Sequence, residues 1–140
     1  MASVALYTPE VLGLATSLAD FAWDESLPLQ GGARSKSCGS TITLGIALDG
    51  QGRIERVGLK SQACAIGQAA AAIFAKAAPG KSLEEVAATR NALLAWLAGQ
   101  AAMPDWEGLA AIALARDYPG RHGAILLPWQ AAGDLLPSGD

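Results

Sequence analysis

The stretch from Ser40 to Gln62, STITLGIALDGQGRIERVGLKSQ, constrains the fold most strongly, because its apolar residues recur mainly at every second position. Such alternation is typical of a strand with one buried face. The turn-forming sequence DGQG separates the two runs and predicts an antiparallel β-hairpin. The apolar positions are Ile42, Leu44, Ile46 and Leu48 in the first run and Ile54, Val57 and Leu59 in the second.

The chain's two cysteines flank this hairpin, with Cys38 before the first strand and Cys64 just beyond the second. Antiparallel pairing brings those two ends to the same edge of the sheet. We therefore predict that the thiols are neighbours, close enough to share a metal or to form a disulfide, which requires Cα atoms within about 7 Å. In a chain without an export signal, two cysteines are not a disulfide framework but either inert core residues or working thiols.

An alanine-rich helix is predicted to begin directly after Cys64, from about Ala65 to Ala78, and to stop at Gly80. At the start of a helix, unpaired N–H groups and the macrodipole favour thiolate over thiol. Such a sulfur is suited to binding metal or attacking sulfur. The alternative is a small buried apolar residue, because unpaired cysteine is among the most often buried side chains.

The rest of the chain is predicted to be mainly helical, with one further strand. Before the hairpin, we expect a helix from Pro9 to about Ala22 and then a short edge strand and loop within Leu27 to Ser37. After the alanine-rich helix, we expect a helix from the Ser82 and Glu85 capping box to near Gly99 and another from about Asp105 to Ala115. The sequence DYPGR then predicts a turn, and LPWQAAGDLL predicts a last helix with Pro128 in its first turn. This order indicates an α+β fold, in which a small antiparallel sheet of about three strands packs against one N-terminal and about four C-terminal helices. Trp96, Trp106 and Trp129 are interpreted as core or interface residues.

Length and charge limit the classes of protein that the chain can represent. Its 140 residues fit one domain, 1–140, with a short flexible tail at about 137–140. Ten basic and thirteen acidic residues give a net charge of −3, without a basic run, which argues against nucleic acid as a partner. The N-terminus lacks a basic n-region, and every apolar stretch is interrupted well before about 20 residues. We therefore expect a cytoplasmic protein without a membrane partner.

The segment CGSTITLGIALDGQGRIERVGLKSQACAIGQAAAAIFAKAAPGKSLEE resembles the core of the NifU-like iron–sulfur cluster scaffold proteins. Those proteins carry Cys-Gly-Asp before the hairpin, and after it Gly-Cys-Ala-Ile-Ser and a helix of small residues ending in Gly-Lys. The matching elements here are Cys38-Gly39-Ser40, Ala63-Cys64-Ala65-Ile66-Gly67 and Gly80-Lys81. The resemblance runs from about Tyr7 to Leu136.

The C-terminal part is similar to the SufU-like branch, which carries Phe-Pro-x-Arg-x-x-Cys-Ala-x-Leu-x-Trp. This chain reads YPGRHGAILLPW from Tyr118 to Trp129, so that Ala124 takes the place of the third cysteine. The Leu-Pro-Pro-Val-Lys motif of the Isc branch is missing from the sequence, and Gly123 stands where that branch has a histidine.

The resemblance implies that Cys38 and Cys64 are ligands for an iron–sulfur cluster, for iron or for zinc. Ser40 replaces the family's aspartate and Ala124 its third cysteine, so half of the ligand set is lost. His122 is a candidate replacement ligand, although a solvated turn histidine is the alternative. We expect metal to be absent or weakly bound in the isolated protein.

Three functions follow from the resemblance. The first is an iron–sulfur cluster assembly scaffold with an impaired metal site, which a second copy could complete in a homodimer. The second is a degenerate docking protein that binds a cysteine desulfurase or another assembly component without carrying a cluster. The third is a persulfide relay, in which Cys64 accepts sulfur and Cys38 resolves it. The third would make the chain a thiol enzyme, but a scaffold or sulfur acceptor is favoured over a turnover catalyst. Recipient apoproteins are further expected partners.

Overall fold

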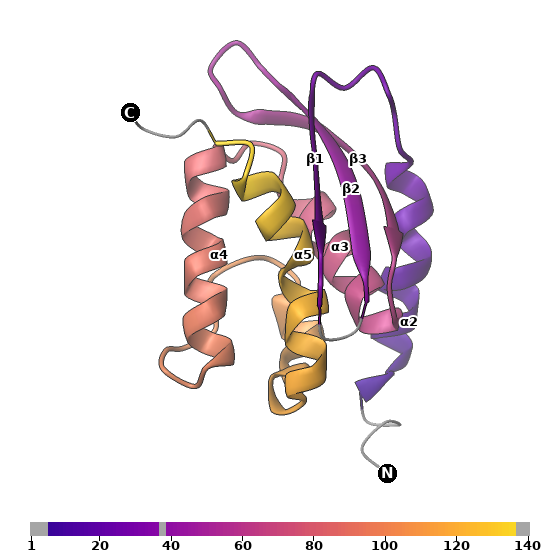
Figure 1. The fold of residues 1–140 in the computed structure, drawn as a ribbon, viewed down its shortest axis with the longest axis vertical. Helices are drawn as coiled ribbons and strands as arrows, with labels where there is room; N and C mark the ends of the chain where they lie inside the picture. Colours follow the sequence, from indigo (N-terminus) through magenta and orange to yellow (C-terminus); the bar gives the residue numbers. More distant parts are fainter. Residues whose placement is uncertain (1–5, 37–38, 137–140) are drawn as a thin grey trace.

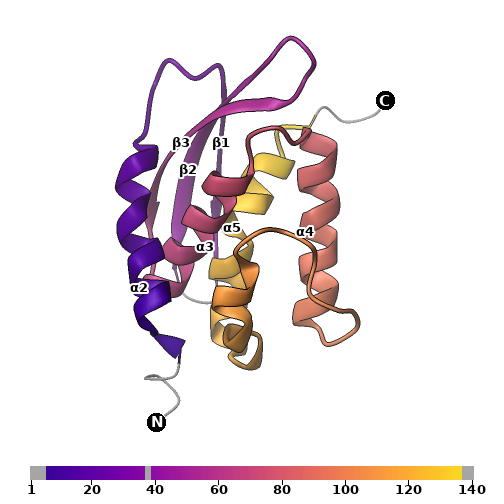
Figure 2. The same cartoon turned by 180° about the vertical axis from the view of Figure 1, so that it is seen from behind.

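A computed structural model describes residues 6–36 and 39–136, and these form a sheet layer and a helix layer (Figures 1 and 2). The sheet contains β1 (Leu29–Arg34), β2 (Thr41–Leu48) and β3 (Ile54–Gln62) in the order β1-β2-β3, with both pairs antiparallel. The helices of the second layer are α2 (Pro9–Thr16), α3 (Ala65–Ala77), α4 (Leu83–Leu97) and α5 (His122–Gly133). The predicted α+β class is confirmed.

The predicted hairpin is present, and its alternation determines which side chains are buried. Leu44 pairs with Leu59, and Ile46 pairs with Val57. Ile42, Leu44 and Ile46 are almost completely buried on the face that α5 covers. The opposite face carries the intervening polar and small residues. This side-chain order fixes the register, because a slip of one residue would expose the apolar set.

Helices α3 and α4 begin and end close to the predicted residues. The αL conformation of Gly80 (φ 91°) follows α3, as the sequence predicted. The Ser82 hydroxyl accepts a hydrogen bond from the Glu85 N–H, and the Glu85 carboxylate accepts one from the Ser82 N–H, which completes the capping box.

Aromatic rings fill the centre of the helix layer. The Phe74 ring stacks on Trp106 with 5.6 Å between centroids, and Trp129 meets both rings edge-on. The Trp106 indole N–H donates to the Ile73 carbonyl at 3.0 Å. Trp96 is also buried, so the interpretation of all three tryptophans as core residues is confirmed.

Two predicted helices differ in type. The first is an α-helix only to Thr16 and continues as the 3₁₀ helix η1 (Ser17–Phe21). The helix predicted from Asp105 to Ala115 is instead a kinked 3₁₀ segment, η2 (Leu109–Asp117). Its buried residues Leu109, Ile112 and Ala115 are spaced by three, which suits the three residues per turn of a 3₁₀ helix.

The prediction for the last helix is wrong about where it begins. The predicted turn DYPGR contains the 3₁₀ turn η3 (Pro119–Arg121), which leads directly into α5 at His122. Pro128 therefore lies inside the helix rather than in its first turn. Proline has no N–H to donate to the carbonyl of Ala124, four residues earlier. Burial of most of α5 explains why the helix continues despite that missing bond.

Among the described residues, no helix is both long and apolar enough to cross a membrane.

Candidate functional site

Cys64 lies where β3 leads into α3, as the N-cap residue of that helix. The side chain is half-buried, forms no disulfide and makes no capping hydrogen bond. The Cys64 carbonyl accepts from the Gln68 N–H at 2.9 Å, so the backbone already follows the helix. The thiol is therefore held in place by the backbone and remains available for chemistry.

Ser40 lies at the same end of the sheet. The last pair of the β2–β3 ladder is Thr41 with Gln62, and Ser40 immediately precedes that pair. Ser40 is buried, and its carbonyl accepts from the Ser35 N–H at 2.8 Å. Cys38 falls outside the described residues, so the predicted proximity of the two thiols stays a prediction.

Ala124, on the first turn of α5, is fully buried against the first turn of α3. A β-carbon added to Gly67 would lie 3.2 Å from the Ala124 β-carbon and 2.7 Å from that of Ala63. The two helices can approach this closely because Gly67 has no side chain. The position of the third cysteine thus adjoins the helix that Cys64 begins, but it carries a methyl group.

His122 was expected on a loop, but it is the first residue of α5. Its Nε2 lies 2.6 Å from the carbonyl oxygen of Arg116. A carbonyl only accepts, so Nε2 carries the proton in this contact and Nδ1 remains for another partner. His122 could therefore join a metal site only through Nδ1 or by giving up this hydrogen bond.

Within the described part of the chain, no three His, Cys, Asp or Glu side chains gather in a group that could hold a metal. Zinc and iron–sulfur clusters are held by about four ligands, mostly thiolates. Cys64 could supply one thiolate, whereas Ser40 offers a neutral hydroxyl and Ala124 no donor. The described residues by themselves do not fit a complete metal site.

Sequence reasoning missed a polar groove of about 420 Å³ on the outer face of the sheet at this end. It is lined by Thr41, Thr43, Lys60, Ser61 and Gln62. The Lys60 ammonium also lies 5.4 Å from the centre of the Trp23 ring. The polar residues that alternate with the apolar ones in the hairpin were the sequence signal for this groove.

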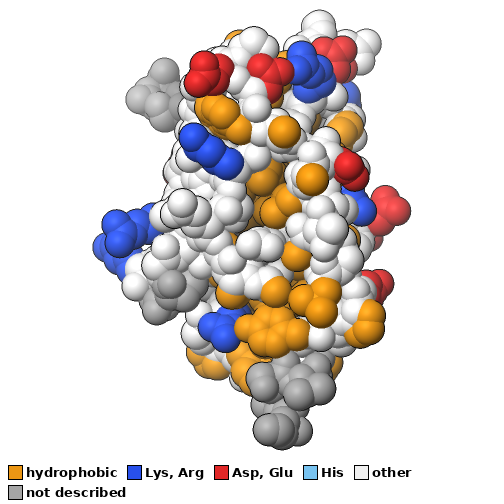
Figure 3. Space-filling view, turned by 90° about the vertical axis from the view of Figure 1, so that its right-hand side faces the viewer, with side chains coloured by type: hydrophobic (Ala, Val, Ile, Leu, Met, Phe, Trp, Pro, Cys, Tyr) orange, Lys and Arg blue, Asp and Glu red, His pale blue; other side chains and the backbone are white. Residues whose placement is uncertain are grey.

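Sequence reasoning also missed how the YPGR segment is attached. The Arg121 guanidinium donates to the Tyr7 hydroxyl at 3.1 Å and so joins η3 to the N-terminal part of the chain. Figure 3 views the molecule from the side on which α2 lies. Apolar side chains gather at the lower end of this view, whereas most acidic side chains lie farther up. The surroundings of the site are therefore more apolar than the opposite end.

Comparison with known proteins matches residues 8–121 to the model of the NifU-like N terminal domain. The chain belongs to that family. Among solved structures, this NifU-like chain is similar to the N-terminal part of a nitrogen-fixing NifU-like protein from Brucella abortus, with a TM-score of 0.86 and 25% identity over 97% of this chain and 95% of the other. A search of the curated proteins finds no match.

A second solved structure is a proposed iron–sulfur cluster assembly scaffold protein for the SUF system from Fervidobacterium islandicum. It has a TM-score of 0.79 and 23% identity over 91% of this chain and 94% of the other, a likeness of fold. The family model stops at residue 121, before Ala124. Because the Brucella abortus likeness covers nearly the whole chain, α5 belongs to the shared fold.

Proposed function

We propose that this NifU-like chain works in iron–sulfur cluster assembly as a scaffold homologue, holding a cluster, iron or zinc through Cys38 and Cys64 with a reduced ligand set. One observation carries the proposal. The Cys64 thiol is half-buried and makes no capping bond, at the end of the sheet where the segment after Cys38 enters β2. Family membership supplies the chemistry that such a thiol would serve.

The reduced ligand set predicts weak retention of metal. Two thiolates give a divalent ion only two bonds, whereas the three thiolates and one carboxylate that the resemblance implies give it four bonds and more negative charge. Thiolate ligands account for much of the binding free energy at such sites. The isolated protein should therefore contain little stoichiometric metal and release it readily to a chelator.

The test is to restore the two missing ligands. Protein purified without oxygen is analysed for iron, sulfide and zinc, alongside the double variant Ser40→Asp with Ala124→Cys. A sulfur at position 124 would enter next to Gly67, which has no side chain. We expect the double variant to retain metal about tenfold better or more, as restored ligation does at other sites.

Two controls show whether the metal occupies the proposed site. Cys64→Ser, added to the double variant, should abolish the gain. His122→Ala should leave the metal content unchanged, because Nε2 already binds the Arg116 carbonyl. One tightly bound metal per chain in the unaltered protein, or no gain in the double variant, would contradict the proposal.

A docking protein without a cluster is the second candidate, favoured by the complete burial of Ala124 and the burial of Ser40. Both former ligand positions contribute to packing. In this case Cys64→Ser would bind a cysteine desulfurase as tightly as the unaltered chain does, as measured by calorimetry, and neither protein would carry metal.

A persulfide relay is the third candidate, favoured by the accessible Cys64 thiol. The Cys64 thiolate would attack the outer sulfur of the desulfurase persulfide, and the desulfurase cysteine would leave as a thiolate. Mass spectrometry after incubation with desulfurase and cysteine would then find one added sulfur atom on Cys64. An unmodified Cys64 would rule this candidate out.

A further inference from the structure

The two edges of the sheet differ in how far other segments cover them. At the β3 edge, Ala22 forms a parallel bridge with Leu59, and η1 packs beside the strand. At the β1 edge, no described residue other than those of β2 pairs with the strand backbone. Open strand edges readily accept another strand, and proteins usually protect them.

The hydrogen-bond pattern shows which groups of β1 face outward. The Ser35 N–H donates to the Ser40 carbonyl, so Ser35 and Ser40 form a hydrogen-bonded pair at the end of the β1–β2 ladder. The two kinds of pair alternate along antiparallel strands. Gln30, Gly32 and Arg34 therefore direct their N–H and C=O groups away from β2, and these same residues are the exposed ones of β1.

Helix α4 extends the helix layer beyond this edge. It packs against α5 and lies to the side of the sheet, farther out than the edge strand β1 (Figures 1 and 2). A groove of about 530 Å³ runs between the strand and the helix, lined by Gly32, Arg34, Arg90, Leu94, Gln130 and Asp134 among others. Leu94 is 46% exposed and lines this groove. In the described structure no strand beyond β1 covers this side of α4.

We propose that this groove binds one extended, acidic segment of a partner protein, which adds to the sheet as a fourth strand beside β1. The outward groups of β1 supply the backbone hydrogen bonds of such β-augmentation. Alternate side chains of the added strand would cover Leu94, and the others would lie on the outer face with Arg34. These two contacts require a strand that alternates apolar and acidic residues.

Charge at the groove favours an acidic occupant. Arg34 is exposed and has no ion pair within the described chain. Among the described residues, Arg90 forms an ion pair only with Asp134, at 3.7 Å, through a carboxylate that is 71% exposed. Asp134 also lines the groove, so two arginines there face one carboxylate. A second copy of the chain fits less well. If β1 paired with a second β1 across a two-fold axis perpendicular to the sheet, both helix layers would lie on one side, and α4 would occupy the place of the partner's α5.

The test uses synthetic heptapeptides as probes against the isotope-labelled full chain. One peptide alternates valine and glutamate, a second alternates valine and lysine, and a third is the glutamate peptide with alternate amides N-methylated. We expect the glutamate peptide to bind with a Kd below about 1 mM and at least tenfold more tightly than the other two. Its binding should shift the amide resonances of Gln30, Gly32 and Arg34 and slow their hydrogen exchange.

Variants of the chain connect binding to the groove. Gly32→Pro removes one outward N–H and no hydrogen bond to β2, as edge positions allow, although its β-carbon would lie 3.1 Å from the Ile42 carbonyl oxygen. It should weaken binding of the glutamate peptide at least tenfold. Arg34→Glu should reverse the preference between the two charged peptides. Lys76→Glu makes the same charge change on an exposed residue that does not line the groove, and it should change neither affinity.

Several outcomes would overturn the proposal. One is that no β1 resonance shifts at millimolar glutamate peptide. Another is that the glutamate peptide binds Arg34→Glu and the unaltered chain equally tightly. A third is that sedimentation equilibrium finds a dimer which Gly32→Pro dissociates. The dimer would mean that a second copy occupies the edge. Should Gly32→Pro fail to fold, Arg34→Glu and the N-methylated peptide decide the question.

Discussion

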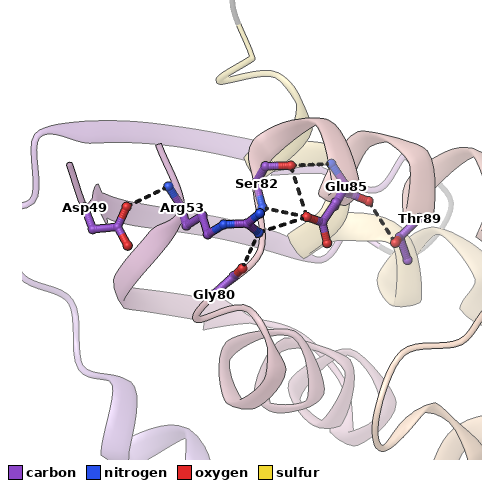
Figure 4. Close-up of polar contacts among 6 residues, drawn as sticks. All are labelled: Asp49, Arg53, Gly80, Ser82, Glu85 and Thr89. Atoms are coloured by element: carbon purple, nitrogen blue, oxygen red, sulfur yellow. Dashed lines mark hydrogen bonds and ion pairs between the residues drawn. The ribbon is translucent and has the colours of Figure 1, made fainter. Parts of the chain in front are cut away.

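The two ends of the sheet are held together by different forces. At the hairpin end, polar groups from three segments are paired with one another (Figure 4). At the cysteine end, small apolar residues pack closely around a half-buried thiol. The comparison separates a polar end that fixes the hairpin to the helices from an apolar end where the resemblance places the family's site.

The hairpin end is joined to the α3–α4 connection through Arg53. Its guanidinium donates to the Gly80 carbonyl at 2.9 Å and contacts the Glu85 carboxylate at 3.3 Å. Asp49 accepts hydrogen bonds from the backbone N–H groups of Arg53 and Gln51, which closes the turn. Because these bonds are largely exposed, each contributes modestly, but together they fix the turn against α4.

The cysteine end uses packing where the resemblance implies ligands. Ala124 and Gly67 bring α5 against α3, and buried Ser40 takes the place of a carboxylate. Apolar substitutions of ligand positions remove binding chemistry while preserving close packing. If positions 40 and 124 are ligand positions, as the resemblance implies, small replacements there preserve the fold.

The largest expected effect is on the packing of the cysteine end. Gly67→Ala should lower the free energy of unfolding by about 1–2 kcal/mol, although alanine is the better helix former, because its β-carbon would be forced against Ala63. Gly13→Ala in α2, where nothing lies within 4 Å, should instead raise it by about 0.5–1 kcal/mol. Urea unfolding measures both. Equal stability of Gly67→Ala and the unaltered chain would mean that Ala63 and Ala124 can move away from position 67 without cost.

The next effect is on the capping box of α4 near the hairpin end. Ser82→Ala should lower the free energy of unfolding by about 1 kcal/mol, because the Glu85 N–H loses its acceptor. Ser82→Thr keeps the hydroxyl and should cost clearly less. If the two variants unfold at the same urea concentration, the hydroxyl is not the stabilising group.

A smaller effect of opposite sign is expected at the other N-cap. Cys64 makes no capping bond, so Cys64→Ser should raise the free energy of unfolding by about 0.5 kcal/mol under reducing conditions. Cys64→Ala removes the thiol without offering a cap and should bring no gain. Such a gain would indicate that Cys64 is kept for chemistry rather than for stability. A less stable Cys64→Ser would show that the sulfur contributes more through packing.

The smallest effect is a pH dependence at the hairpin. The backbone N–H groups of Arg53 and Gln51 hold the pKa of Asp49 below its usual 3.8. A carboxyl with a lowered pKa in the folded state stabilises that state above the unfolded pKa, and this contribution is lost as pH falls through the folded pKa. The difference in Tm between the unaltered chain and Asp49→Asn should therefore shrink in acid below about pH 4. A constant difference would mean that Asp49 does not titrate with folding.

Local patterns in the sequence predicted much of the fold. Alternation predicted the β2–β3 hairpin, the Ser82 and Glu85 pair predicted the start of α4, and the position of Cys64 at the start of α3 is confirmed. Each depends on interactions between residues close together in sequence or on a regular period. Such signals do not require knowledge of the rest of the fold.

Features that depend on distant contacts could not be predicted in this way. Pro128 indicated a helix start, but burial of α5 outweighs its missing hydrogen bond. The approach of Ala124 to Gly67 joins segments far apart in sequence, and so does the groove between β1 and α4. The spacing of the two thiols stays a prediction, since Cys38 is outside the described residues.

The late position of α5 in the chain has a consequence for synthesis. Strands β1 and β2 are complete by residue 48, but the helix that covers their apolar face begins only at His122. Contacts so distant in sequence form late, and uncovered strands promote aggregation. A nascent chain paused before α5 emerges from the ribosome would present Ile42, Leu44 and Ile46 without that cover. The apolar face of β1 and β2 can therefore be covered only after α5 has been synthesised.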